Sequence, residues 1–248
     1  MTEHLEGEIE ALYEVFGRVP RPLRVEGCAH CVAADEDRPL LAGPVRDLEP
    51  DVLQRYATEA LLLWGDVPEL RYFLPRLLEI GAGDGFEFGF PDPEIVFGKL
   101  GLARWTEWDD DERAAISALL TRWWELTVVD GDPWPSAGTV LCSLGRTGVD
   151  LVPFLDRWER LESTGAIRNL HEFVMEEMTW PSSGPKLRNP FWEKESAAYQ
   201  ETVAWLTDGR ALAAVERAFQ NESQDEPLTL LDEIHSVLGP QTTAVRAE

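Results

Sequence analysis

Two cysteines three residues apart are the residues of this chain best suited to chemistry. Cys28 and Cys31 flank His30 within the segment Gly27–Cys31. Two thiolates at this spacing can bind one zinc ion, which takes four ligands in tetrahedral geometry. Cys142 is the remaining thiol of the chain. The predicted zinc site therefore consists of Cys28, Cys31 and Cys142 with one histidine. His30 is the nearest candidate, and His171 and His235 are the distant ones.

The same cysteine pair has two other interpretations. A redox dithiol would also use a Cys-x-x-Cys spacing, but the long helix that follows such a pair in thioredoxin is interrupted here by the polar segment Asp35–Pro39. Because the chain has no second Cys-x-x-Cys pair, the pattern is also only half of a full zinc motif. Ordinary thiols with no chemical role are the third interpretation.

A glycine-rich stretch gives a second candidate site. Leu77–Gly85 is similar to the first motif of S-adenosylmethionine-dependent methyltransferases, in which a strand ends in a glycine turn and a helix follows. The candidate ligand loop is Gly81, Gly83, Asp84 and Gly85. The residues before it continue a helical stripe, however, and no helix can begin directly after it. A helix that ends in glycines is the competing interpretation.

Composition limits the classes of partner. The chain has 46 acidic and 22 basic residues and a net charge of −24, so phosphate backbones and anionic membranes would be repelled. The sequence shows no phosphate loop and no nucleophile elbow. No apolar run is long enough to cross a membrane, and the N-terminus lacks the layout of a signal peptide. We therefore expect a cytoplasmic protein that binds neither nucleic acid nor membrane.

The ten tryptophans divide into two groups. Half of them lie on helical apolar stripes and are predicted to anchor the core: Trp64, Trp123, Trp124, Trp158 and Trp205. The other half fall near helix ends or in loops. Three of these, Trp134, Trp180 and Trp192, are candidates for a surface that binds a cationic segment by cation–π contact and ion pairing.

The spacing of apolar residues predicts an all-α, multi-helix globular fold of about nine to eleven helices, with little or no β-structure. The predicted helices are Glu3–Phe16, Pro50–Trp64, a helix from Asp66 to Ile80, Pro93–Leu102, Glu107–Val128, Gly138–Leu144, Val149–Leu161, Ala166–Met178, Glu193–Leu206, Arg210–Phe219 and Leu228–Leu238. Val25–Val32 and Glu87–Phe90 are the two plausible strands. We expect a single domain over residues 1–240, with residues 180–190 as the candidate seam between two lobes, and a flexible tail over residues 241–248.

Two blocks carry a resemblance to known sequences. One combines the Gly-Cys-x-His-Cys segment with Tyr56–Val67 and Tyr72–Glu79, and the other combines Phe97–Leu100 with Trp105–Trp108. Together they resemble an uncharacterised family of bacterial cytoplasmic proteins from high-GC organisms. The resemblance covers the first half of the chain and implies no catalytic residue. It favours the helix-ending interpretation of Leu77–Gly85.

These observations predict a non-enzymatic protein. Its acidic surface with exposed aromatic side chains is suited to a basic protein partner, as in adaptor or immunity-like proteins. The alternative from another class is a metal-dependent or S-adenosylmethionine-dependent enzyme acting on a small molecule. The sequence leaves the oligomeric state open.

Overall fold

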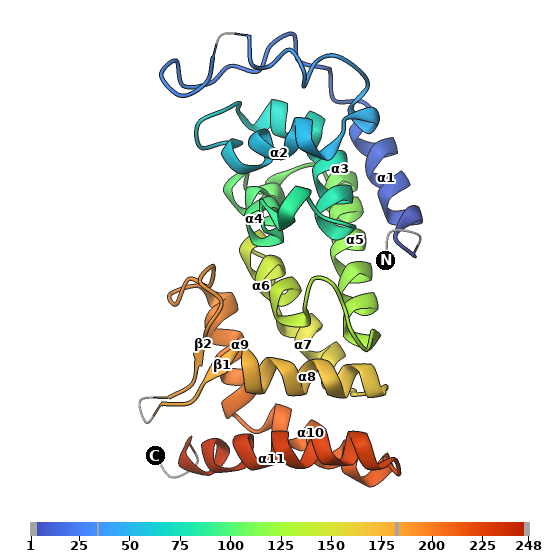
Figure 1. The fold of residues 1–248 in the computed structure, drawn as a ribbon, viewed down its shortest axis with the longest axis vertical. Coiled ribbons are helices and arrows are strands. Elements are labelled where there is room, and N and C mark those ends of the chain that lie inside the picture. The colour runs from blue at the N-terminus through green and yellow to red at the C-terminus, as the bar shows by residue number, and fades with distance from the viewer. Residues whose placement is uncertain (1–3, 34, 182–183, 246–248) are drawn as a thin grey trace. The chain divides into compact units, whose positions relative to one another are not determined.

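The fold is all-α, as predicted. The computed structural model describes residues 4–33, 35–181 and 184–245, and within these it has eleven α-helices and one two-stranded sheet (Figure 1). The first five helices are α1 (Glu6–Phe16), α2 (Pro50–Glu59), α3 (Val67–Ala82), α4 (Pro93–Leu102) and α5 (Asp110–Val129). The others are α6 (Ala137–Thr147), α7 (Val152–Trp158), α8 (Thr164–Glu176), α9 (Ala197–Thr207), α10 (Arg210–Asn221) and α11 (Asp225–Val245). Three 3-10 helices lie at Val45–Asp47 (η2), Glu87–Gly89 (η3) and Trp105–Glu107 (η4).

The chain divides into two compact units, unit 1 (Met1–Trp123) and unit 2 (Trp124–Glu248). The boundary falls inside α5, between two consecutive tryptophans. The candidate seam at residues 180–190 belongs to unit 2, and its residues 182–183 lie outside the described residues. The seam contains β2 (Lys186–Leu187), which pairs antiparallel with β1 (Met178–Thr179). The segment 241–248, for which we expected a tail, is helical as far as Val245, and residues 246–248 lie outside the described residues.

In unit 1, helix α3 packs against α1 and α4 (Figure 1). Its start is fixed by a capping box, in which Asp66 and Glu69 exchange side-chain to backbone hydrogen bonds. The helix continues through Pro75 without a break, and nine of its residues are buried. The core also contains Phe97, whose ring stacks on that of Trp123 with centroids 4.4 Å apart.

Two local predictions for unit 1 are wrong. Helix α2 ends at Glu59, not at Trp64, because Ala60 leaves the helical conformation with a ψ of 133° and Leu61 has a φ of 65°. Neither predicted strand forms: Glu87–Phe90 contains η3, and Val25–Val32 contributes a single bridge from Gly27 to Trp64. Trp64 is nevertheless buried. The apolar spacing therefore gives its burial correctly but not its backbone conformation.

Unit 2 has an aromatic core. The Trp158 ring lies 5.3 Å from Trp124, 5.4 Å from Phe173 and 5.6 Å from Trp205, measured between centroids. Each indole N–H has an acceptor: that of Trp124 donates to Phe154 O, that of Trp158 to Ala166 O, and that of Trp205 to Glu159 Oε1. Because every indole N–H of this cluster has an acceptor, the burial of these rings leaves no donor unsatisfied. These residues therefore anchor the core, as their helical spacing predicts.

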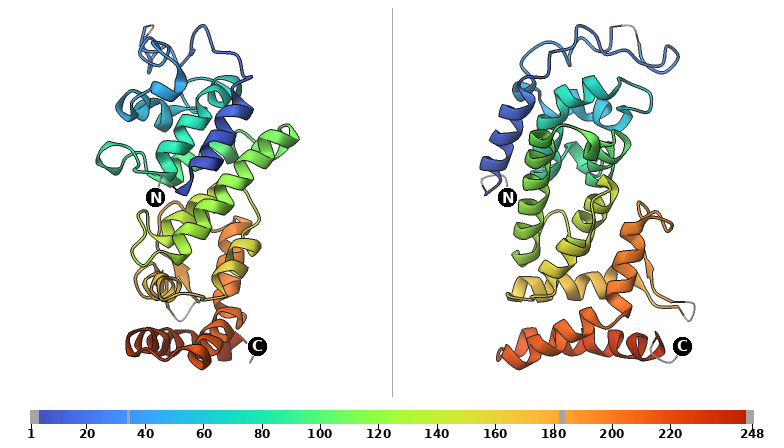
Figure 2. Two further views of the ribbon diagram at one scale, coloured as in Figure 1. Left: turned by 90° about the vertical axis from the view of Figure 1, so that its right-hand side faces the viewer. Right: turned by 180° about the vertical axis from the view of Figure 1, so that it is seen from behind.

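Helices α8 and α11 run side by side in all three views (Figures 1 and 2). Polar contacts join their edges: His171 Nε2 lies 2.5 Å from Glu233 Oε2, and Arg168 Nε donates to Glu226 Oε1 at 2.9 Å. In the part of the chain that the structure describes, no helix is both long and apolar enough to cross a bilayer.

Candidate functional site

The two neighbouring cysteines lie in one turn, and long-range backbone hydrogen bonds hold that turn in place. Cys28 N donates to Leu63 O at 2.8 Å, and Gly65 N donates to Glu26 O at 2.7 Å. The segment that carries Cys28 thus pairs with the chain that follows α2. Cys31 N donates to Cys28 O at 2.9 Å, which closes the turn and brings the two cysteine residues close together.

Side chains around the turn fix it further. Trp64 Nε1 donates to Val25 O at 3.1 Å. Arg55 of α2 donates to Cys31 O at 2.6 Å, forms ion pairs with Glu36 and Glu59, and lies 5.8 Å from the centroid of the Trp64 ring. The position of the cysteine pair is therefore determined by a cation and an indole from elsewhere in unit 1.

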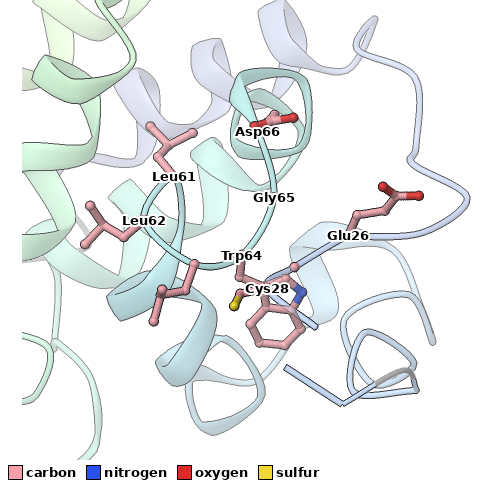
Figure 3. Close-up of a pocket in the computed structure, with 9 residues that line it drawn as sticks. Glu26, Cys28, Leu61, Leu62, Trp64, Gly65 and Asp66 are labelled. Carbon is pink, nitrogen blue, oxygen red and sulfur yellow. The ribbon is translucent and has the colours of Figure 1, made fainter. Parts of the chain in front are cut away.

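The cysteine turn borders an open hollow of about 300 Å³ (Figure 3). Its lining is Glu26, Gly27, Cys28 and the six residues Leu61–Asp66. Leu62 is 63% exposed and Leu63 is 42% exposed, so apolar side chains reach solvent here. Two exposed carboxylates, those of Glu26 and Asp66, are also part of the lining. The hollow therefore combines one thiol, apolar side chains and negative charge.

The surroundings of the two thiols differ. Hydrogen bonds from the backbone N–H of His30, then from the Cys31 thiol and the Cys31 backbone N–H, lower the pKa of the Cys28 thiol. The contact with Cys28 raises the pKa of the Cys31 thiol. Hydrogen-bond donors thus stabilise a thiolate at Cys28 and not at Cys31.

The four residues predicted to bind zinc belong to two different units of the chain. Cys28, His30 and Cys31 are exposed and belong to unit 1, whereas Cys142 is completely buried in α6 of unit 2. Among the described residues, no group of three or more histidine, cysteine, aspartate or glutamate side chains is arranged to hold a metal ion. The described geometry therefore leaves the cysteine pair with two neighbouring thiols and no ligand set around them.

The candidate ligand loop is the end of a helix. Gly81 lies in the last turn of α3, and a Cβ there would be 3.2 Å from side-chain atoms of both Val96 and Phe97, so a small residue lets α4 pack closely. Gly83 follows the last helical residue, and Gly85 N donates to Ile80 O at 2.9 Å to close the helix end. The residues before this loop form helix α3 and not the strand that a nucleoside-cofactor turn requires.

Comparisons with models of known families, with curated proteins and with solved structures find no match to this chain. The resemblance of the first half to a bacterial family therefore stays a prediction. The function has to be argued from the chain's own geometry.

The three tryptophans predicted to bind a partner have different environments. Trp134 is 72% exposed, and it lies between two buried prolines in the loop from Asp130 to Ser136, which we call the Trp134 loop. Trp180 is half-buried and donates its Nε1 hydrogen to Val174 O at 3.2 Å. Trp192 is half-buried against Tyr199, with centroids 6.3 Å apart. Of the three, only Trp134 presents most of its indole to solvent.

Sequence reasoning missed the parts of the hollow that surround Cys28. The apolar spacing places Leu61, Leu62 and Leu63 in the predicted helix Pro50–Trp64, and it gives Arg55 no role. The sequence does contain one signal: Leu61, Leu62 and Leu63 are consecutive, and three consecutive residues cannot all face the core from one helix. For Arg55 the sequence gives no signal, because its contacts come from distant segments.

Proposed function

We propose that the protein is a non-enzymatic interaction protein that binds a basic segment of a partner protein, with Trp134 at the centre of the contact. The observation that carries this proposal is the exposure of Trp134. All ten tryptophans lie among the described residues, and the other nine are buried or half-buried. An exposed indole offers a large apolar surface that a partner can bury on binding.

The chemistry beside Trp134 favours a cation. The face of an indole ring attracts a guanidinium or ammonium group. Asp130 and Asp132 precede the tryptophan in the same loop, and their carboxylates are exposed. An arginine or lysine of the partner could therefore stack on the ring while a neighbouring basic residue pairs with a carboxylate.

The Trp134 loop is fixed at both ends. At its start, Asn169 Nδ2 donates to three backbone oxygens, those of Thr127, Val128 and Asp130. At its end, the hydroxyl of Ser136 caps α6 and donates to Glu177 Oε1 at 2.8 Å. A loop that is already ordered loses little conformational entropy on binding, so contacts to Trp134 contribute more of their energy to affinity.

The charge of the whole chain supports the same class of partner. A net charge of −24 attracts basic proteins over a distance of about one Debye length and repels nucleic acids. Trp180 and Trp192 are half-buried, in contact with Val174 O and with the Tyr199 ring, so they offer a partner less indole area than Trp134 does.

The test is the binding of a fluorescently labelled arginine-rich peptide, followed by anisotropy at low and at physiological salt. Trp134→Ala should weaken binding by about 1–2 kcal/mol, or roughly five- to thirtyfold. The matched control is Leu102→Ala, which removes another exposed apolar side chain (52% exposed) in unit 1 and should change nothing. An acidic peptide of equal length should not bind.

A charge variant and a stability measurement complete the experiment. Asp130→Asn combined with Asp132→Asn should reduce both the affinity and its dependence on salt. The melting temperature of Trp134→Ala should equal that of the wild type, since an exposed side chain contributes little to the fold. Equal affinity of the wild type and Trp134→Ala for the basic peptide would refute the proposal.

A further inference from the structure

We propose that Cys28 and Cys31 form a reversible dithiol–disulfide pair that exchanges with small disulfides. The backbone hydrogen bond from Cys31 N to Cys28 O, 2.9 Å long, makes a tight turn of residues 28–31. Such a turn brings its first and last Cα atoms within about 7 Å, and a disulfide needs about 4.4–6.8 Å. The two side chains are close enough for each thiol to shift the pKa of the other. Closure of a disulfide therefore needs only a small movement of two adjacent side chains.

Access to the pair is open. Both cysteines are exposed, and Cys28 also lines the hollow of about 300 Å³. A reagent can thus approach the Cys28 sulfur from the side of the hollow. Cys142, by contrast, is completely buried in α6. The chain therefore provides two reactive thiols and one protected thiol that serves as an internal control.

The two sulfurs have different roles. Cys28 lines the hollow and Cys31 does not, and the neighbouring backbone N–H groups of His30 and Cys31 lower the pKa of the Cys28 thiol. The contact with Cys28 raises the pKa of the Cys31 thiol. Cys28 is therefore the attacking thiol, and Cys31 is the resolving thiol that displaces the bound group.

The reaction balances with a low-molecular-weight disulfide, RS–SR, as the oxidant. The Cys28 thiolate attacks one sulfur, the S–S bond of the reagent breaks, and the departing RS⁻ takes up the proton that Cys28 released. The Cys31 thiol then loses its proton and attacks the Cys28 sulfur, and the second RS⁻ leaves and is protonated. The protein gives up two electrons, one disulfide forms in it, and two RSH molecules are released.

The charge of the hollow sets the preferred reagent. Glu26 and Asp66 place two exposed carboxylates in its lining, and Arg55 is already paired with Glu36 and Glu59. A cationic disulfide such as cystamine should therefore react faster than anionic glutathione disulfide, by roughly tenfold at low ionic strength. The difference should shrink as salt is added.

The test uses the full-length reduced protein. It is incubated with cystamine or glutathione disulfide, quenched with acid, alkylated and mapped by mass spectrometry. We expect an intramolecular Cys28–Cys31 disulfide in the wild type and in Cys142→Ser. Cys31→Ser should accumulate a stable mixed disulfide at Cys28. Cys28→Ser should react far more slowly at Cys31. Serine at either exposed position should leave the circular dichroism spectrum unchanged.

Three outcomes would overturn the inference. One is a wild-type protein that carries mixed disulfides on both cysteines and never closes the pair. Another is a Cys31→Ser variant whose Cys28 does not react faster than Cys31 does in Cys28→Ser. The last is stoichiometric zinc in the purified protein that Cys28→Ser abolishes, because the pair would then be a metal site. Failure of any of these tests leaves the Trp134 proposal untouched, since the peptide assay does not involve thiols.

Discussion

Asn169 gives the most direct test of how unit 2 holds the Trp134 loop. The residue is 2% exposed in α8, and its Nδ2 lies 3.0, 3.0 and 2.9 Å from the oxygens of Thr127, Val128 and Asp130. These oxygens belong to the end of α5 and the first residue of the loop. Carbonyl oxygens at a helix C-terminus have no donor within the helix, so the side-chain amide of Asn169 provides the hydrogen-bond donors that the backbone lacks.

The expected loss of stability in Asn169→Ala follows from the number of hydrogens on the Asn169 amide nitrogen. Two N–H hydrogens serve three oxygens, so Asn169 contributes the equivalent of two hydrogen bonds at about 1 kcal/mol each. Asn169→Ala also leaves buried oxygens unsatisfied, which adds about 1 kcal/mol. We therefore expect a loss of about 3 kcal/mol in the unfolding free energy of unit 2. For a unit of this size the melting temperature should fall by about 10 °C.

Chemical denaturation and thermal melting measure the effect, and two variants sharpen it. Asn169→Asp keeps the shape but faces the three oxygens with further oxygens, so it should destabilise more than Asn169→Ala. The control is Asn221→Ala: Asn221 donates to Arg217 O at 2.9 Å, but it is exposed and water can replace it, so the loss should stay below about 0.5 kcal/mol.

The reasoning would be refuted if Asn169→Ala and Asn221→Ala lowered stability equally. It would also be refuted if Asn169→Asp were as stable as the wild type, because a carboxylate cannot donate to the three carbonyls. In the peptide assay, Asn169→Ala should bind more weakly than the wild type well below its melting temperature. The loosened loop must then be ordered during binding.

Two further predictions concern packing and pH. A Cβ on Gly165 would overlap the carbonyl oxygens of Val129 and Asp130, so Gly165→Ala should destabilise unit 2 in denaturant titrations. The control is Gly239→Ala: a Cβ at Gly239 would meet open space, so this variant should be neutral or stabilised by up to about 1 kcal/mol. Burial raises the pKa of Tyr13 and of Tyr56 above the ordinary tyrosine value of about 10, so their neutral forms favour the folded state. The stability they provide should be complete below about pH 10 and decline above it. Absorbance at 295 nm should show incomplete ionisation of the four tyrosines in the folded protein at pH 11; complete ionisation without unfolding would contradict the burial.

The helices could be predicted where local signals decide them. Helix α4 has the predicted bounds, Pro93–Leu102, because a proline begins it and an apolar run follows. The start of α3 was predicted from Asp66, which does form a capping box. Trp124 and Trp158 were correctly assigned to the core from helical spacing alone. These features depend on residues within one or two turns of each other.

The end of α2 could not be predicted in this way. Leu61 and Trp64 keep the apolar spacing of the helix, and Trp64 is indeed buried. What diverts the chain is the pairing of Gly65 N with Glu26 O and of Cys28 N with Leu63 O. These bonds join segments more than thirty residues apart, which a local pattern does not register.

The candidate sites show the same limit. Cys28 and Cys31 are visible in the sequence, but the hollow beside them depends on the diverted chain after α2. Trp180 and Trp134 looked alike in the sequence because each stands near prolines outside a helix. The hydrogen bond of Trp180 to Val174 O, six residues earlier in α8, distinguishes this half-buried indole from the exposed one of Trp134. Predicting a binding residue from its type therefore requires the contacts that compete for it.

The division of the chain makes the two proposals separable. Trp123 stacks on Phe97 in unit 1, while Trp124 packs on Trp158 in unit 2, so consecutive residues of α5 serve different cores. The cysteine pair and its hollow belong to unit 1, and the Trp134 loop belongs to unit 2. A substitution at one site should therefore leave the local packing of the other intact. If oxidation of the cysteine pair nevertheless changes the affinity for the basic peptide, in a way that Cys28→Ser abolishes, then the two sites are coupled, and the protein would bind its partner according to the redox state of its thiols.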